Sequence, residues 1–257
     1  MKALRISVTL LFFCCALQLF GQNPLVGTWE RKTDFIQATK IITPTHWAIF
    51  IDSINTHAFV RSHGGTYTIS DKKYIEYLDV ASWDNKGELS FTDFSYKVEG
   101  DKFYQNGTLI LSDGSVVPID EVWVKVSSAT SNPSYPAIGA WNLVSSSFTW
   151  GDGKKDNAIF TRFEIISPTH WMRISHRDHE FESAMGGTYT VGGNKASMKV
   201  GFASFPINKI EKVEATDKVS RDKRNSTGII TAPGGKTIAT FDDVYKKAIG
   251  KSQEAKK

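Results

Sequence analysis

The hexapeptide "ITPTHW" at residues 42–47 recurs as "ISPTHW" at residues 166–171. Each copy is preceded by a Gly-x-Trp segment, "VGTW" in the first half of the chain and "IGAW" in the second. Each is followed by a second shared motif, "HGGTYTI" or "MGGTYTV". Three motifs repeated in one order indicate two copies of a single domain. We place these copies at residues 24–127 and 137–249.

Within each copy the apolar side chains alternate with a period of two, as in "THWAIFI" and "KFYQNGTLIL". Such runs, rich in β-branched and aromatic residues and bounded by turns such as "DNKG" and "EGD", predict short strands. We expect an all-β fold of about eight antiparallel strands per copy, forming an up-and-down sheet that closes on itself to protect its edges. Residues 128–136 are predicted to be a linker short enough to keep the two units in contact, and residues 250–257 a disordered tail.

The first 21 residues are typical of a secretory signal peptide. Lys2 and Arg5 precede an apolar run that ends at Phe20, and this run is shorter than the roughly 20 residues of a bilayer span. Both cysteines, Cys14 and Cys15, lie inside this segment, so the mature chain has neither disulfides nor thiolate chemistry. We expect a secreted or periplasmic protein with no integral membrane segment after signal removal.

Charge and motifs exclude several classes of function. Removal of the signal leaves 29 basic and 27 acidic residues, and much of the basic excess lies at residues 245–257, which does not favour nucleic acid as a partner. The chain contains no phosphate loop, nucleophile elbow or dinucleotide-binding fingerprint. We therefore predict a small-molecule ligand and no cofactor. The sequence does not specify the oligomeric state.

The motifs resemble those of a known group of barrels. "GTW" at 27–29 and "GAW" at 139–141, each followed by the "PTHW" and "GGTYT" motifs in an exported chain, are similar to lipocalin-like (calycin) domains of secreted bacterial proteins with unassigned function. The resemblance covers each copy once. It implies a barrel with a cavity at one end and Trp29 or Trp141 closing the other. The helix and disulfide of larger lipocalins are missing here, so the resemblance does not fix the size of the cavity.

Strand alternation predicts which side chains point into each barrel. Arg173 shares a face with Trp171, and arginine tolerates water better than Met172 does, so we expect His46 and His170 on the opposite, inward face. The same counting gives the first copy an interior with His46, Phe59, Arg61, His63, Tyr67, Tyr74, Glu76 and Val80. The second copy keeps His170 and Tyr189 but has Ser183, Met185, Ala196 and Met198 at four of these places.

This comparison of the copies suggests that the first one holds the functional pocket. An isolated buried charge is costly, whereas a cluster of mixed sign satisfies itself and also binds a polar ligand. The predicted ligand-binding residues are His46, Arg61, His63, Tyr67, Tyr74, Glu76, His170 and Tyr189. The second copy is expected to be a degenerate or apolar-pocket partner. These assignments assume that no bulge interrupts the strands, because one inserted residue reverses every face.

Several alternatives remain open. The simplest interpretation of the two histidines is a buried structural imidazole, and the alternative is direct ligand contact or proton transfer. The Gly-Gly pairs at 64–65 and 186–187 are most simply bulges or tight bends, and the alternative is close approach to a ligand. A calycin-type isomerase, cyclase or hydrolase would use His46 or His63 as acid or base, with Glu76 tuning its pKa. A third possibility is a solid, non-catalytic extracytoplasmic scaffold. His46, His63 and Glu76 have the residue types of a zinc site but no local ligand spacing, so we predict no metal.

Overall fold

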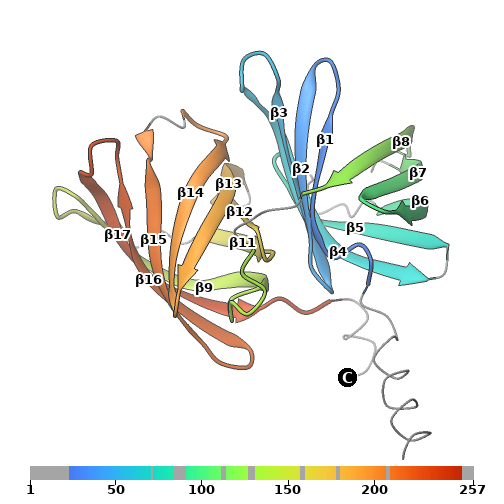
Figure 1. Cartoon of the computed structure of the whole chain (residues 1–257). Coiled ribbons are helices and arrows are strands. Elements are labelled where there is room, and N and C mark those ends of the chain that lie inside the picture. The colour runs from blue at the N-terminus through green and yellow to red at the C-terminus, as the bar shows by residue number, and fades with distance from the viewer. Residues whose placement is uncertain are drawn as a thin grey trace, which may run out of the picture.

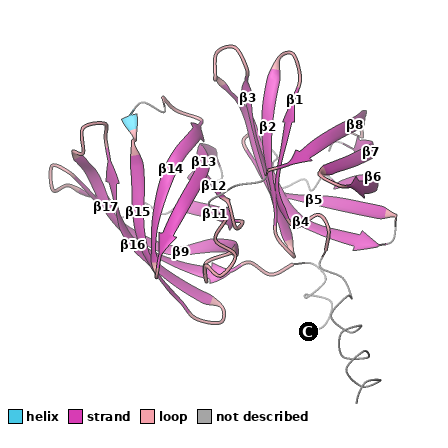
Figure 2. Cartoon of the chain, in the orientation of Figure 1, coloured by secondary structure: helices cyan, strands magenta, loops and turns pink. Residues whose placement is uncertain are grey.

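The computed structural model describes residues 23–250 except 71, 84–90, 111–113, 127–130, 157–159, 178–179 and 207–208. The predicted signal peptide and residues 251–257 of the predicted tail lie outside this part of the chain. Strands form nearly all of the regular structure (Figure 2) and are arranged as two barrels beside each other (Figure 1). Within the described ranges no helix is long and apolar enough to cross a membrane.

The first barrel is an up-and-down meander. Its strands are β1 (Gly27–Lys32), β2 (Ile36–Ile42), β3 (His46–Ser53), β4 (Phe59–Ser70), β5 (Lys73–Ala81), β6 (Phe91–Glu99), β7 (Lys102–Ile110) and β8 (Val116–Lys125). Each strand pairs with the next in antiparallel fashion, and β8 pairs with β1. The sheet is therefore closed, as predicted.

The second barrel repeats this plan. Its strands are β9 (Gly139–Trp150), β10 (Lys155–Asp156), β11 (Phe160–Ile166), β12 (His170–Arg177), β13 (Glu180–Gly192), β14 (Lys195–Ala203), β15 (Lys212–Val219), β16 (Lys223–Thr231) and β17 (Thr237–Lys247). Pairing of β17 with β9 closes an eight-stranded barrel, and the two-residue β10 extends β9 as a small hairpin.

The Gly-x-Trp motif supplies one core tryptophan to each barrel. Trp29 and Trp141 are fully buried, and their indole Nε1 groups donate hydrogen bonds of 2.7 Å to the carbonyls of Leu25 and Ala137. These carbonyls belong to the segment that leads into the first strand of each barrel. Both tryptophans are therefore structural, with their single polar group satisfied by the backbone.

The "PTHW" motif builds the turn before β3 and before β12. Thr43 Oγ1 accepts a hydrogen bond from the amide of His46 at 3.1 Å, and the Thr43 carbonyl accepts one from the Tyr67 hydroxyl at 2.7 Å. The second copy makes the same contacts through Ser167, His170 and Tyr189. These hydrogen bonds hold the turn against the next strand of the barrel. Because each barrel contains this turn, the motif occurs in both copies.

The two barrels share a third hydrophobic core at their contact, separate from the core of each barrel. Phe50 and Phe202 lie 4.4 Å apart between ring centroids, and Phe59 stacks on Phe181 at 5.4 Å. Strands β11 and β12 face the first barrel (Figure 1). The units are in contact, as the short linker predicts, and Tyr135 of that linker is buried in the second core.

The predicted direction of His46 and His170 is wrong. On β3, Trp47, Ile49 and Ile51 belong to the core of the first barrel, while Ala48 and Phe50 belong to the shared core between barrels. His46 lies on that outer face, where its ring is 5.7 Å from Phe163 of the other barrel. His170 occupies the equivalent face of β12.

The reasoning failed because the outer face of these strands is covered by protein. Met172 and Ile174 are buried outside their own barrel, in the shared core. Arg173 is inside, where it lies 5.0 Å above the Trp171 ring and pairs with Glu164 at 3.6 Å. The prediction assumed that arginine faces water and that apolar side chains face the barrel interior. Both assumptions fail here, because the arginine is paired inside the barrel and the apolar outer face is covered by the other barrel.

Bulges account for two further corrections. The register between β4 and β5 shifts at Gly64/Gly65, and that between β3 and β4 shifts at Ile51/Asp52. Phe59 and Val80, predicted to face inward, therefore lie against the shared core. The Gly-Gly pair lies at this bulge, opposite its extra residue Asp79 on β5. A Cβ on Gly65 would come within 2.1 Å of the Tyr77 carbonyl, so the close backbone approach here is between neighbouring strands.

Acid is expected to destabilise the protein through the two motif histidines. His46 and His170 are 4% and 7% exposed, and burial lowers the pKa of each from 6.5 to about 4. Between these two pKa values the unfolded chain binds more protons than the folded chain. The contribution of the two histidines to the free energy of unfolding is therefore present above pH 6.5 and is lost as the pH falls toward 4. We expect a loss of about 2–3 kcal/mol per histidine between pH 7 and pH 4.

Urea unfolding at the two pH values measures this loss. His46→Gln and His170→Gln should each flatten the pH dependence relative to the wild type. An unchanged pH dependence in both motif variants would show that these imidazoles do not control acid stability.

Candidate functional site

The first barrel encloses a cavity of about 300 Å³. Its aromatic wall is formed by Trp47, Trp83, Phe94 and Trp123, and aliphatic side chains complete the apolar surface. Its polar groups are Arg31, Arg61, His63, Glu76, Thr92, Gln105 and Glu121. Apolar walls with a few convergent polar groups are the usual composition of a small-molecule site.

A buried ion pair lies at the inner wall of the cavity. Lys40 of β2 is fully buried, and its ammonium pairs with the Glu76 carboxylate of β5 and donates a hydrogen bond of 2.8 Å to Gln105 Oε1. The same ammonium lies 5.2–5.5 Å from the centres of four aromatic rings, those of Trp47, Tyr74, Phe103 and Trp123. Burial raises the pKa of Glu76, and the charge of Lys40 opposes that shift.

The charges at the outer part of the cavity are only partly paired. Arg31 and Glu121 form an ion pair at 3.3 Å, and Glu121 also accepts a hydrogen bond from Trp123 Nε1 at 3.1 Å. Arg61 is exposed and lines the cavity, yet it makes no ion pair with any described residue. Among the described residues, the wall thus carries one positive charge without an ionic partner.

His63 lies beside this cation in an aromatic frame. Its ring is 5.3 Å from Trp47 and 5.2 Å from Trp83, edge-on to both. Its Nδ1 is buried without a hydrogen-bond partner, and the residue as a whole is half-buried. Burial, with the charges of Arg61 and Lys40, lowers the pKa of His63 to about 3. The imidazole is therefore neutral at physiological pH.

Three of the predicted site residues, Arg61, His63 and Glu76, are brought together on the cavity wall. Tyr67 and Tyr74 point inward but belong to the packed core, 5.3 Å apart, rather than to the wall of the cavity. Tyr67 is held by Thr43 and also accepts a hydrogen bond from Asn23 Nδ2 at 2.6 Å. The interior of the first barrel therefore has a packed part, which contains Tyr67 and Tyr74, and an open part, which is the cavity.

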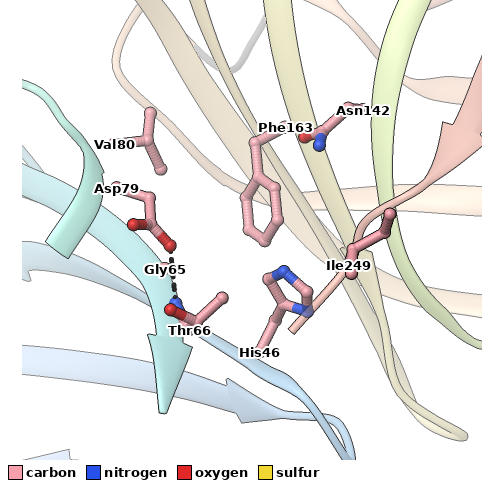
Figure 3. Close-up of a pocket in the computed structure, with 8 residues that line it drawn as sticks. All are labelled: His46, Gly65, Thr66, Asp79, Val80, Asn142, Phe163 and Ile249. Atoms are coloured by element: carbon pink, nitrogen blue, oxygen red, sulfur yellow. Dashed lines mark hydrogen bonds between the residues drawn. The ribbon is translucent and has the colours of Figure 1, made fainter. Parts of the chain in front are cut away.

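His46 lines a different pocket, of about 240 Å³, between the two barrels (Figure 3). Phe163, Asn142 and Ile249 of the second copy close this pocket, and Asp79 accepts a hydrogen bond from the Thr66 amide at 2.8 Å on its other side. The zinc set considered above is therefore not assembled, because His46 is on the opposite side of β3 from His63 and Glu76. Across the described ranges, no group of three or more His, Cys, Asp or Glu side chains is placed to hold a metal ion.

The second barrel is not the apolar partner that the sequence suggested. Tyr189 and Met198 lie in its core as expected, but five buried charged side chains lie inside the barrel too, together with the largely buried Arg162: Glu164, Arg173, Asp217, Arg224 and Asp243. Arg224 donates to Glu164 at 2.5 Å and Arg162 to Asp243 at 2.7 Å. Except for Arg173, which was assigned to the outer face of β12, these charges lie on strands that we did not compare between copies, and the prediction therefore missed them.

The sequence matches no protein-family model and no curated protein. Among solved structures, the chain is similar to a protein with unknown function from the DUF3598 family of Nostoc punctiforme PCC 73102. The two are 10% identical, the match covers 87% of this chain and 96% of that chain, and the TM-score is 0.27. Similarity at this level assigns neither a family nor a function.

The geometry of the first lumen suits binding better than acid–base catalysis. A general base works best with a pKa near the operating pH, and the pKa of His63 lies far below it. Glu76 is engaged by Lys40 rather than directed at His63. What the described residues of the cavity offer is aromatic contact area, one guanidinium without an ionic partner and one neutral imidazole.

Proposed function

We propose that this is an exported binding protein that holds a small, partly apolar molecule in the lumen of its first barrel. The observation that carries the proposal is the cavity of about 300 Å³ with its four aromatic side chains. This volume is near the lower end of the range for small-molecule sites, so the ligand is compact. The lipocalin-like resemblance of the motifs points to the same use of the lumen, and the basic and apolar segments of residues 1–21 support export.

The second barrel has a supporting part in this proposal. Its interior charges pair with one another, which leaves fewer groups free for a ligand. Its outer face covers Ala48 and Phe50 of the first barrel and thereby fixes β3, whose other face carries Trp47 into the cavity. Rigid strands position a binding site more accurately than loops do.

Trp83 provides the test of this proposal, because it lines the cavity and is 38% exposed. Titration with indole derivatives, medium-chain fatty acids and monosaccharides should give a saturable change in tryptophan fluorescence for at least one class. Trp83→Ala should weaken that binding about tenfold, since buried contacts of tryptophan rank among the strongest in binding sites. Trp150→Ala is the matched control, at a tryptophan 42% exposed on the second barrel. Absence of any saturable response, or equal affinity in Trp83→Ala, would contradict the proposal.

A further inference from the structure

We propose that the ligand of the first barrel is a flat apolar acid, whose carboxylate pairs with Arg61 while its ring lies against the tryptophans of the lumen. This inference rests on the proposed function and names the chemical class of its ligand. It follows from the charges on the cavity wall, from the unpartnered nitrogen of His63 and from the difference between the two repeats.

One charged group of the cavity wall is available to bind a charged ligand. Lys40 is neutralised by Glu76, and Arg31 by Glu121. In the part of the chain that the structure describes, Arg61 alone among the charged groups of this wall lacks a partner of opposite sign. A guanidinium presents parallel N–H donors that match a carboxylate, so an anionic ligand completes this wall and a cationic one is repelled.

His63 supplies a second polar contact next to the first. Arg61 and His63 are two residues apart on β4, and both line the cavity, so their side chains project from the same face of the strand. The Nδ1 of His63 is already shielded from water and has no hydrogen-bond partner, so a ligand group that reaches it satisfies a polar atom that is otherwise costly to bury. The neutral imidazole serves an acid or hydroxyl group without adding a charge of its own.

The aromatic groups around this pair favour a flat ring as the rest of the ligand. Trp47 and Trp83 lie on two sides of His63, and Trp123 forms another part of the wall. Aromatic side chains bind planar rings by stacking and edge contacts while they lose little conformational freedom. A flexible chain of the same length would lose more entropy in a cavity of this size.

The second repeat lacks the arginine and the histidine of this wall. At the positions equivalent to Arg61 and His63 it has Ser183 and Met185. Met185 belongs to the packed core of the second barrel. The cation and the imidazole are therefore features of one copy and are not needed to form the barrel, which is the pattern expected of binding groups rather than of structural ones.

Three indoles with the same ring and different charge test the inference on the full mature chain. We expect indole-3-acetate to bind about tenfold more tightly than neutral indole-3-acetamide, and cationic tryptamine most weakly, as measured by calorimetry. Arg61→Gln should abolish the preference for the acid, and Arg61→Lys should retain part of it. Arg177→Gln, which removes an exposed arginine of the second barrel, should leave all three affinities unchanged.

The pH dependence identifies the residue that receives the anion. Binding of indole-3-acetate should be constant between pH 6 and pH 8, because arginine remains charged and His63 remains neutral across this range. A preference for the acid that rises steadily below pH 6.5 would assign the charge to His63 and overturn the role of Arg61.

The remaining outcomes separate the two proposals. Equal affinities for the acid and the amide, or a preference that survives Arg61→Gln, would overturn the inference, while binding that depends on Trp83 would still support the proposed function. Failure of all three indoles to bind would also overturn it. The lack of any saturable ligand in the wider panel, or binding that is unaffected by Trp83→Ala, would overturn both.

Discussion

Lys40→Met is expected to lower the free energy of unfolding by about 3–5 kcal/mol at pH 7, the usual cost of removing one partner of a buried ion pair. The variant leaves the Glu76 carboxylate buried without its cation, beside the Tyr74 hydroxyl and under the like charge of Glu121. Methionine has almost the length of lysine, so the loss reflects charge more than volume. Denaturant unfolding monitored by circular dichroism measures it.

The pH dependence and a double variant identify the cause of this loss. Without Lys40 the pKa of Glu76, already raised by burial, rises further. A carboxyl group with a raised pKa is least costly below its unfolded value of 4.5, so the deficit of Lys40→Met should be small near pH 4 and grow as the pH rises. Adding Glu76→Gln should recover much of the stability at pH 7.

An exposed ion pair provides the control. Lys73 and Asp93 pair at 2.8 Å on the outer wall, with both side chains largely exposed. Lys73→Met should therefore cost less than about 1 kcal/mol. If Lys40→Met also cost less than about 1 kcal/mol at every pH, the buried pair would not support the lumen of the first barrel.

Repetition of motifs, together with the period of two, was sufficient to predict two closed antiparallel barrels. The role of each motif was predicted less completely. The "PTHW" turn, with Thr43 holding His46 and Tyr67, is a structural device present in both copies. A motif shared by two copies thus reports on the fold, and the copies must be compared at their differences to find a site.

The faces of the strands were predicted correctly only between bulges. Arg61, His63 and Glu76 line the lumen as expected because the extra residues, Val60 and Asp79, lie beyond them on the two strands. On the far side of each bulge the alternation inverts, and a sequence without a turn residue at Val60 does not reveal the shift. The alternation of side chains assigns residues to the two faces of a strand only as far as no bulge interrupts the register.

Lys40 was missed, although the sequence contained an indication of it. Its counterpart in the second copy is Glu164, so one position of the repeat carries opposite charges in the two barrels. Each is paired within its own barrel, Lys40 with Glu76 and Glu164 with Arg224. In both copies the charged residue directly precedes the pair "II", and all four isoleucines are fully buried. A charge next to such a pair in both copies indicates a buried ion pair rather than a surface charge.

Phe50→Ala is expected to destabilise the protein by about 3–5 kcal/mol, because it opens a cavity in the core that the two barrels share. Phe50 is almost fully buried, and its ring packs against Phe59 of its own barrel and Phe202 of the other, at 5.3 and 4.4 Å. The loss should be seen as a lower denaturant midpoint.

A double-mutant cycle shows whether the two barrels stabilise each other through this contact. Phe50→Ala and Phe202→Ala together should cost about 1 kcal/mol less than the sum of the single variants, as expected for an aromatic pair. Phe50→Ala with Phe103→Ala is the control, because Phe103 lies in the core inside the first barrel, on the other side of the sheet. That pair should be additive. Additivity in both pairs would mean that the barrels fold without mutual support, and that β3, with Trp47 on its inner face, is positioned by the first barrel alone.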